Sequence, residues 1–135
     1  MFLESANALL YLKAQSLDVY IKGTDEVGEI SFPAVVIKHL EIVDETKLNE
    51  LIISFIAKSG LENQSAVLLL SDEVTFHKNI NRDTPETEKA LIEAFFDKVP
   101  LEKSHQAKKV LVSENALIAV ATNRSFYESI INSFS

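Results

Sequence analysis

The spacing of apolar residues changes from two to about three and a half within the first half of the chain, and this change restricts the fold more than any other feature. Leu17, Val19 and Ile21 alternate with more polar residues, as in a strand with one buried face. Between Leu48 and Ile56, by contrast, apolar residues recur at helical spacing and form one stripe. A chain with both patterns in succession is expected to be α/β or α+β.

Two further extended segments are expected near this strand. Leu9 to Leu12 is apolar enough for a buried strand and predicts a hairpin with the strand that starts at Leu17. Residues 23–28 are interpreted as a polar turn, and residues 29–43 as a third extended segment. Pro33 must lie at an edge, bulge or break of that segment, because proline has no N–H to donate to a sheet.

The first helix has recognisable ends. Asp44 or Thr46 can cap its N-terminal amides, and Gly60 can adopt the left-handed conformation just past its last turn. The helix is therefore expected to occupy most of residues 44–61. Its predicted buried stripe contains Leu48, Leu51, Ile52, Phe55 and Ile56.

The second half of the chain repeats the alternation of strands and helices. The run SAVLLLS, residues 65–71, is typical of a strand covered on both faces, and the chain is expected to change sheet near Asp72 before a further strand. A second helix is predicted to begin at Thr84 as N-cap, with Pro85 in its first turn, and to stop at Pro100.

The last third of the sequence predicts a hairpin and a closing helix. Residues 108–123 form two apolar runs separated by Glu114 and Asn115, which are expected in the turn. The closing helix starts near Arg124, and its predicted buried side contains Phe126, Tyr127, Ile130, Ile131 and Phe134. The predicted order is strand, strand, strand, helix, strand, strand, helix, strand, strand, helix.

Composition and charge exclude several classes of function. Asp and Glu number 20 against 13 Lys and Arg, so the net charge of −7 would repel a nucleic-acid backbone. The absence of cysteine removes disulfides, thiolate metal sites and cysteine nucleophiles. Glu4 and Asn7 interrupt the first apolar run, so neither a signal peptide nor a membrane span is predicted. We therefore expect a soluble cytoplasmic protein that binds no nucleic acid and does not insert into a membrane.

The polar residues give weak signals for a catalytic or metal site. His39, His77 and His105 are far apart, and none has a second ligand type at helical spacing, so no metal site is predicted. The stretch SDE, residues 71–73, could be imagined as a nucleophile beside an acid, with His77 as base. A turn between two strands explains the same polar residues, and we prefer that interpretation.

The adjacent Phe95 and Phe96 in the second helix suggest a contact surface. Neighbouring helical residues point about 100° apart, so a narrow core contact does not easily bury both. Leu91 and Ile92 form a second pair of adjacent apolar residues in the same helix. A wide core between two layers is one explanation; a partner-binding groove formed by Leu91 and Phe95 or by Ile92 and Phe96 is the other.

Three stretches combine these predicted helices and strands: HLEIVDETKLNELIISFIAKSGLENQSAVLLLS, SDEVTFHKNINRDTPETEKALIEAFFDKVPLEKS and ALIAVATNRSFYESIINSF. They resemble the N-terminal half of the type IV pilus assembly protein PilM, an actin-like family related to FtsA and to the cytoplasmic part of the type II secretion protein GspL. The resemblance implies a partial actin-like, ribonuclease-H-like mixed sheet over residues 1–72. It also implies an appended strand-helix-strand-strand-helix subdomain over 73–135, packed with the first as one unit.

The resemblance also places a phosphate loop between the first two strands. ATP-binding members carry an acid toward the metal, a glycine for close backbone approach and a lysine or hydroxyl for phosphate. Aligned with that motif, Tyr11 stands at the acid, Lys13 at the glycine and Asp18 at the lysine, and only Ser16 is retained. The sequence thus predicts a degenerate loop, no cofactor and no enzymatic activity.

The resemblance implies a non-catalytic adaptor for a type IV pilus or type II secretion-like machine. Its partner would be the cytoplasmic tail of an inner-membrane protein, which would recruit the chain to the inner face of the membrane. The sequence does not decide whether the chain forms a homo-oligomer. The alternatives are an ATP-binding actin-like ATPase fragment that lacks its second half, and an unrelated small α/β domain with the same order of elements.

Overall fold

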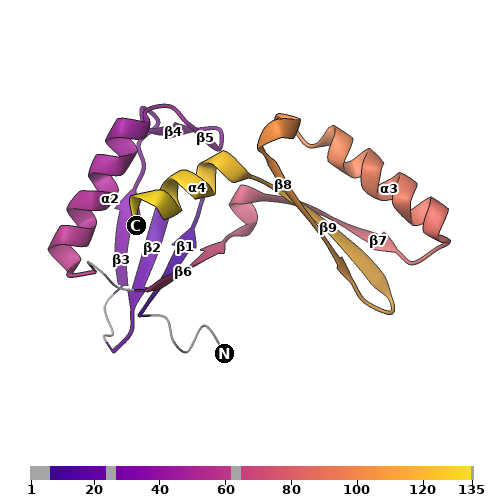
Figure 1. Cartoon of the computed structure of the whole chain (residues 1–135), viewed down its shortest axis with the longest axis horizontal. Coiled ribbons are helices and arrows are strands. Elements are labelled where there is room, and N and C mark those ends of the chain that lie inside the picture. Colours follow the sequence, from indigo (N-terminus) through magenta and orange to yellow (C-terminus); the bar gives the residue numbers. More distant parts are fainter. Residues whose placement is uncertain (1–6, 24–26, 62–64, 135) are drawn as a thin grey trace. The chain divides into compact units, whose positions relative to one another are not determined.

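The computed structural model describes residues 7–23, 27–61 and 65–134 of the 135-residue chain (Figure 1). Residues 1–6 of the N-terminal segment thus lie outside the described residues. So do residues 24–26 of the predicted turn over 23–28. The chain divides into two compact units. Unit 1 contains the residues up to Val74 and those from Ser125 onward, and unit 2 contains Thr75–Arg124.

Unit 1 is built on a four-stranded mixed sheet in the order β3-β2-β1-β6. Strands β1 (Ala8–Leu12) and β2 (Ser16–Ile21) form the predicted antiparallel hairpin, β3 (Val27–Ser31) pairs with β2, and β6 (Ala66–Leu70) runs parallel to β1. The prediction that the SAVLLLS strand is covered on both faces is wrong. β6 is an edge strand, and Leu69 on its outer face is 42% exposed.

The predicted third extended segment is broken where its proline lies. β3 ends at Ser31, and the carbonyl of Pro33 accepts hydrogen bonds from the N–H groups of Val36 and Ile37 in a tight turn. A two-stranded hairpin of β4 (Ile37–Lys38) and β5 (Glu41–Ile42) follows. Its two turn residues, His39 and Leu40, both have positive φ angles, 51° and 61°.

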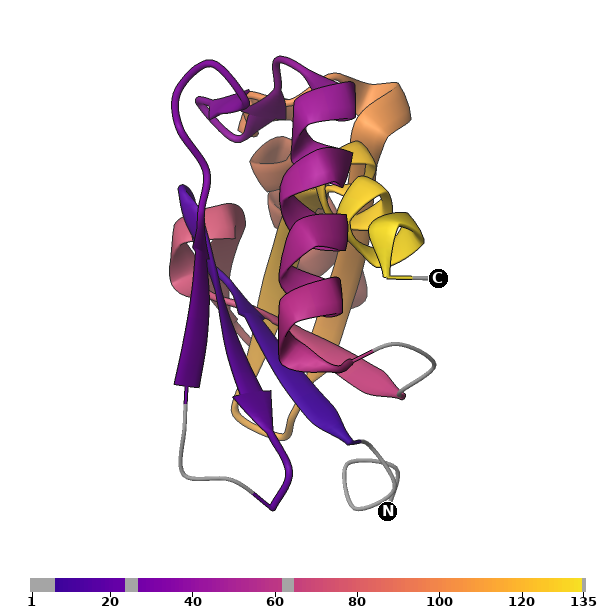
Figure 2. The same ribbon diagram turned by 90° about the vertical axis from the view of Figure 1, so that its left-hand side faces the viewer.

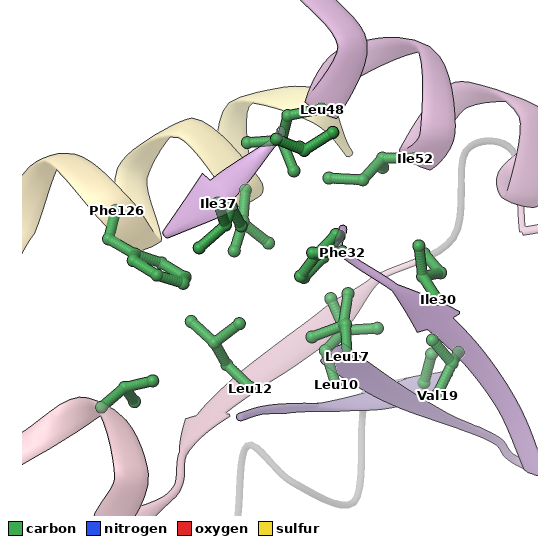
Figure 3. Packing of buried hydrophobic residues seen from close by; sticks show 14 of the residues in the cluster. Leu10, Leu12, Leu17, Val19, Ile30, Phe32, Ile37, Leu48, Ile52 and Phe126 are labelled. Atoms are coloured by element: carbon green, nitrogen blue, oxygen red, sulfur yellow. The ribbon is translucent and has the colours of Figure 1, made fainter. Parts of the chain in front are cut away.

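Helix α2 (Glu45–Ser59) has the predicted caps. The side chain of Asp44 accepts from the N–H of Lys47 at 3.0 Å, and Gly60 is left-handed with φ 74°. The predicted apolar stripe of α2 packs on one face of the sheet, which we call the inner face. One side of helix α4 (Arg124–Ser133) packs there too, so both helices cover the same face (Figure 2). The side chains that point toward one another in this core include Leu10, Leu12, Leu17, Val19, Ile30, Phe32, Ile37, Leu48, Ile52 and Phe126 (Figure 3).

The closing helix corrects the predicted division of the chain. Residues 73–135 were expected to form the second subdomain, but Phe126 and Ile130 lie in the core of unit 1, so α4 belongs to the first unit. Ile131, expected on the buried side, is 44% exposed. The helical pattern identified a buried side but did not say which sheet that side covers.

Unit 2 contains a three-stranded antiparallel sheet in the order β7-β9-β8 and one α-helix, α3. The strands are β7 (Thr75–Asn81), β8 (Gln106–Val112) and β9 (Ala116–Asn123), and α3 spans Pro85–Lys98. A short 3-10 turn, Asp72–Val74, leads into β7, which confirms the predicted change of sheet near Asp72. Thr84 caps α3 through its side chain, as predicted, and a second 3-10 turn spans Lys103–His105.

Candidate functional site

The turn between β1 and β2 is the position at which the resemblance places a phosphate loop. The strands pair up to Leu12 and Leu17, and the N–H of Lys13 donates to the carbonyl of Ser16 at 2.8 Å. Tyr11 pairs with Asp18 across the strands, so their side chains share the outer face of the sheet. The hairpin thus brings together all four residues predicted from the sequence.

Carboxylates surround the one cationic side chain of this turn. The ammonium Nζ of Lys13 lies 3.1 Å from Oδ2 of Asp18. This hydrogen bond raises the pKa of the lysine above its ordinary value, and the negative charges of Glu29 and Glu73 act in the same direction. Lys13 is therefore held in its charged form, but its charge is directed at a neighbouring carboxylate.

The backbone of the turn also faces a carboxylate. The N–H of Ala14, at the tip, donates to Oε1 of Glu73 at 3.3 Å. Gln15 holds the other side of the turn, because its Nε2 donates to the carbonyls of Phe32 (2.7 Å) and Ile37 (2.9 Å). Neither Gln15 nor Glu73 was predicted to lie at this turn. Glu73 lies 59 residues from Ala14, and no local pattern links the two.

The chemistry of this turn is unfavourable for an anion. Three carboxylates, from Asp18, Glu29 and Glu73, lie around a single ammonium, so a phosphate would meet net negative charge. A phosphate loop offers free backbone N–H groups to its ligand, whereas the tip amide here already donates to Glu73. No group of three or more His, Cys, Asp or Glu residues in the described part of the chain could hold a metal ion.

The residues predicted as a partner surface lie on α3 in unit 2. Ile92, Phe95 and Phe96 are half-buried and pack against the small core formed by Ile80, Leu117 and Ala119. Leu91 points away from this core and is 39% exposed. Packing on the sheet thus explains most of the adjacent apolar pairs Leu91–Ile92 and Phe95–Phe96. Partner binding by these four residues stays a prediction.

The other polar residues singled out from the sequence do not converge on one site. Ser71 is buried at the end of β6, and its Oγ accepts from the N–H of Glu73 at 3.3 Å, as in the turn that was preferred. His39, His77 and His105 are exposed, and they lie apart, in the β4–β5 turn, in β7 and in the second 3-10 turn. His105 forms an i,i+3 contact with Glu102 at 3.7 Å, on the surface of the second 3-10 turn.

Comparison with known proteins rests on structure alone, because neither a protein-family model nor a curated protein sequence matches this chain. The cytoplasmic domain of EpsL, an inner-membrane component of the type II secretion system of Vibrio cholerae, aligns with 93% of this chain at 14% identity and a TM-score of 0.52. The PilM–PilN type IV pilus biogenesis complex aligns with 93% of it at 13% identity and a TM-score of 0.61.

This chain has the fold of the aligned parts of EpsL and of the PilM–PilN complex. The predicted actin-like, PilM-type fold is thereby confirmed, with the first three strands and the last two in separate sheets. The aligned region covers 50% of the EpsL chain and 42% of the chain in the PilM–PilN complex, so this chain spans half or less of their length. None of its helices, over the residues described, is long and apolar enough to cross a membrane.

Proposed function

We propose that this actin-like chain is a non-catalytic adaptor that acts through protein contacts in a type IV pilus or type II secretion-like machine. The observation that carries the proposal is the hydrogen bond from the tip amide of Ala14 to the Glu73 carboxylate. A carboxylate of the protein takes the place that a nucleotide phosphate would need. The salt bridge between Lys13 and Asp18 supports the same conclusion, since it commits the only cation of the turn.

The competing proposal is an ATP-binding actin-like ATPase fragment whose second half lies outside this chain. The short coverage of both matched chains is compatible with that view. However, the second half would not change Tyr11, Lys13 and Asp18, which belong to the first loop. The charge around this loop therefore favours the adaptor.

The fold suggests where such an adaptor would act. EpsL is described as an inner-membrane component of a secretion system, and PilM is described in a complex with PilN in pilus biogenesis. By analogy, we propose that this chain works in the cytoplasm and is recruited to the inner membrane by the tail of a membrane-anchored assembly protein. Self-association remains compatible with this role.

Calorimetric titration with Mg-ATP, alongside an ATP-binding actin-like protein as a positive control, tests the proposal. We expect no heat of binding and no change in melting temperature. Micromolar binding that is lost in Lys13→Ala would show that the turn still holds phosphate and would overturn the proposal.

Crosslinking in cells that express a tagged version of the chain provides the complementary test. Enrichment of membrane-anchored pilus or secretion components is expected. A monomer that crosslinks to no membrane protein would contradict the adaptor role even if ATP does not bind.

A further inference from the structure

Strand β8 leaves one side of its backbone open. β8 is an edge of the unit 2 sheet, and the N–H of Ser113 donates to the carbonyl of Ala116 at 2.9 Å, which fixes the phase of the ladder. Hydrogen-bonded and non-hydrogen-bonded pairs alternate along antiparallel strands. The backbone N–H and C=O groups of Lys108, Val110 and Val112 therefore point away from β9. We call these outward groups the β8 edge.

The side chains of Val110 and Val112 face a groove beside α3. Helix α3 packs mainly over β7 and β9, so it leaves the inner face of β8 partly open. The resulting groove has a volume of about 380 Å³. Ile92, Val110, Val112 and Leu117 form its apolar floor together with Pro85, and two cations and two carboxylates, from Arg82, Lys89, Glu88 and Glu93, form its rim. Val112 is 67% exposed, so an added strand would have apolar surface to cover at this position.

Charge distinguishes this edge from the rest of the molecule. Unit 1 has thirteen Asp and Glu against five Lys and Arg, whereas unit 2 has seven against eight. Two of the basic residues, Lys108 and Lys109, are adjacent on β8, directly before the apolar run Val110–Val112. Lys108 lies over the ring of Phe96 with Nζ 5.4 Å from its centroid, and Lys109 is exposed on the opposite face.

The other edge strand offers no comparable surface. The middle of β7, residues 77–79, is polar and exposed, and none of its residues lines the groove. An added strand at β7 would find open backbone groups but no apolar contacts for its side chains. Within unit 2, an open backbone, apolar groove-lining side chains and two adjacent lysines coincide only along β8.

We propose that the β8 edge binds an extended segment of a protein partner that combines apolar and acidic residues. The segment adds a fourth strand to the unit 2 sheet, antiparallel to β8. Its apolar side chains lie opposite Val112 and Val110 and enter the groove, and its acidic side chains lie opposite Lys109 and Lys108. This proposal rests on the adaptor function and names the chemistry of the partner.

The test uses a synthetic peptide with this pattern, acetyl-Val-Thr-Val-Glu-Glu-Thr-amide, titrated into the isotope-labelled whole chain and followed by NMR of the backbone amides. In the proposed register its valines face Val112 and Val110, and its glutamates face Lys109 and Lys108. We expect shift changes at β8 and at the groove side of α3. A peptide with two lysines in place of the glutamates is expected to bind more weakly.

Two charge-reversal variants form a matched pair. Lys109→Glu should weaken binding of the acidic peptide about threefold to tenfold, the range for reversal of one exposed charge pair, and should favour the lysine peptide. Lys78→Glu changes the net charge equally, but on exposed β7, and should leave both affinities unchanged. Both positions are exposed, so neither variant is expected to unfold the chain.

The outcomes separate this inference from the adaptor function. No shift changes at millimolar peptide, changes confined to β7, or equal effects of the two variants would overturn binding at the β8 edge. If Lys109→Glu also retains its crosslinks to membrane-anchored components, the adaptor function stands and the partner uses another surface. A concentration-dependent dimer that Val110→Pro abolishes would show that β8 pairs with a second copy, which would also overturn the proposal.

Discussion

The contact between Gly28 and Phe55 gives a test of how tightly the core of unit 1 is packed. Gly28 lies in β3 on the inner face of the sheet, and the Phe55 ring of α2 packs directly on it. A Cβ atom at position 28 would lie 2.5 Å from Cζ and 2.9 Å from Cε2 of that ring. In Gly28→Ala the half-buried ring must therefore move away from the sheet and give up part of its packing against the core.

The expected loss of stability follows from two opposing effects. Overpacking a core costs about 1–3 kcal/mol, and replacing glycine by alanine gains about 0.4–1 kcal/mol through the unfolded chain. We therefore expect Gly28→Ala to lower the free energy of unfolding by about 1–2 kcal/mol, or the melting temperature by roughly 4–7 °C. Tyrosine fluorescence during urea unfolding reports on the correct unit, because all three tyrosines belong to unit 1.

A double-mutant cycle isolates the contact. Phe55→Leu alone should destabilise through lost packing, but in that background the substitution Gly28→Ala should be neutral or slightly stabilising, because the ring is gone. The coupling energy would then be about 1 kcal/mol or more, within the range for residues in contact. An equal cost of Gly28→Ala in both backgrounds, or no cost in the wild type, would refute the packing argument.

Three further substitutions test local features. His39→Asn should stabilise unit 1 by about 0.5–1 kcal/mol, because asparagine tolerates the left-handed conformation that His39 adopts, and unchanged urea unfolding would contradict this. Asp44→Ala should cost about 1 kcal/mol through loss of the α2 cap, whereas Asp44→Asn should cost less. The backbone N–H of Asp83 and, to a smaller extent, Arg82 lower the pKa of Glu88 below its ordinary value of 4.5. The ionised Glu88 therefore stabilises the folded chain above pH 4.5, and this contribution is lost as the pH falls through the lowered pKa of the folded state. Glu88→Gln should therefore flatten the decline of melting temperature between pH 5 and acid, and an unchanged pH profile would count against it.

Features set by local sequence were predictable. The caps at Asp44, Gly60 and Thr84 and the helix start at Pro85 depend on residues within one turn, and all four lie where they were expected. The hairpin turn at Glu114 and Asn115 was found for the same reason. In each case the physical cause, a side-chain acceptor or a backbone preference, acts over a few residues.

Features set by distant contacts were not predictable in this way. The pattern of α4 gave its apolar side, but only the packing of Phe126 and Ile130 shows that it completes unit 1. Pro33 indicated a break in the third strand, but nothing indicated the strained turn at His39 that follows. The candidate loop shows the same limit, since the motif positions were readable while the Glu73 carboxylate that faces the loop comes from another element.

The return of α4 to the first unit has a consequence for synthesis on the ribosome. The core of unit 1 needs Phe126 and Ile130, so it stays incomplete until nearly the whole described chain has been translated. Unit 2 is one continuous segment, and all of its strands emerge before α4 does. We therefore expect unit 2 to fold first during translation, while the strands of unit 1 await their last helix and depend most on chaperones.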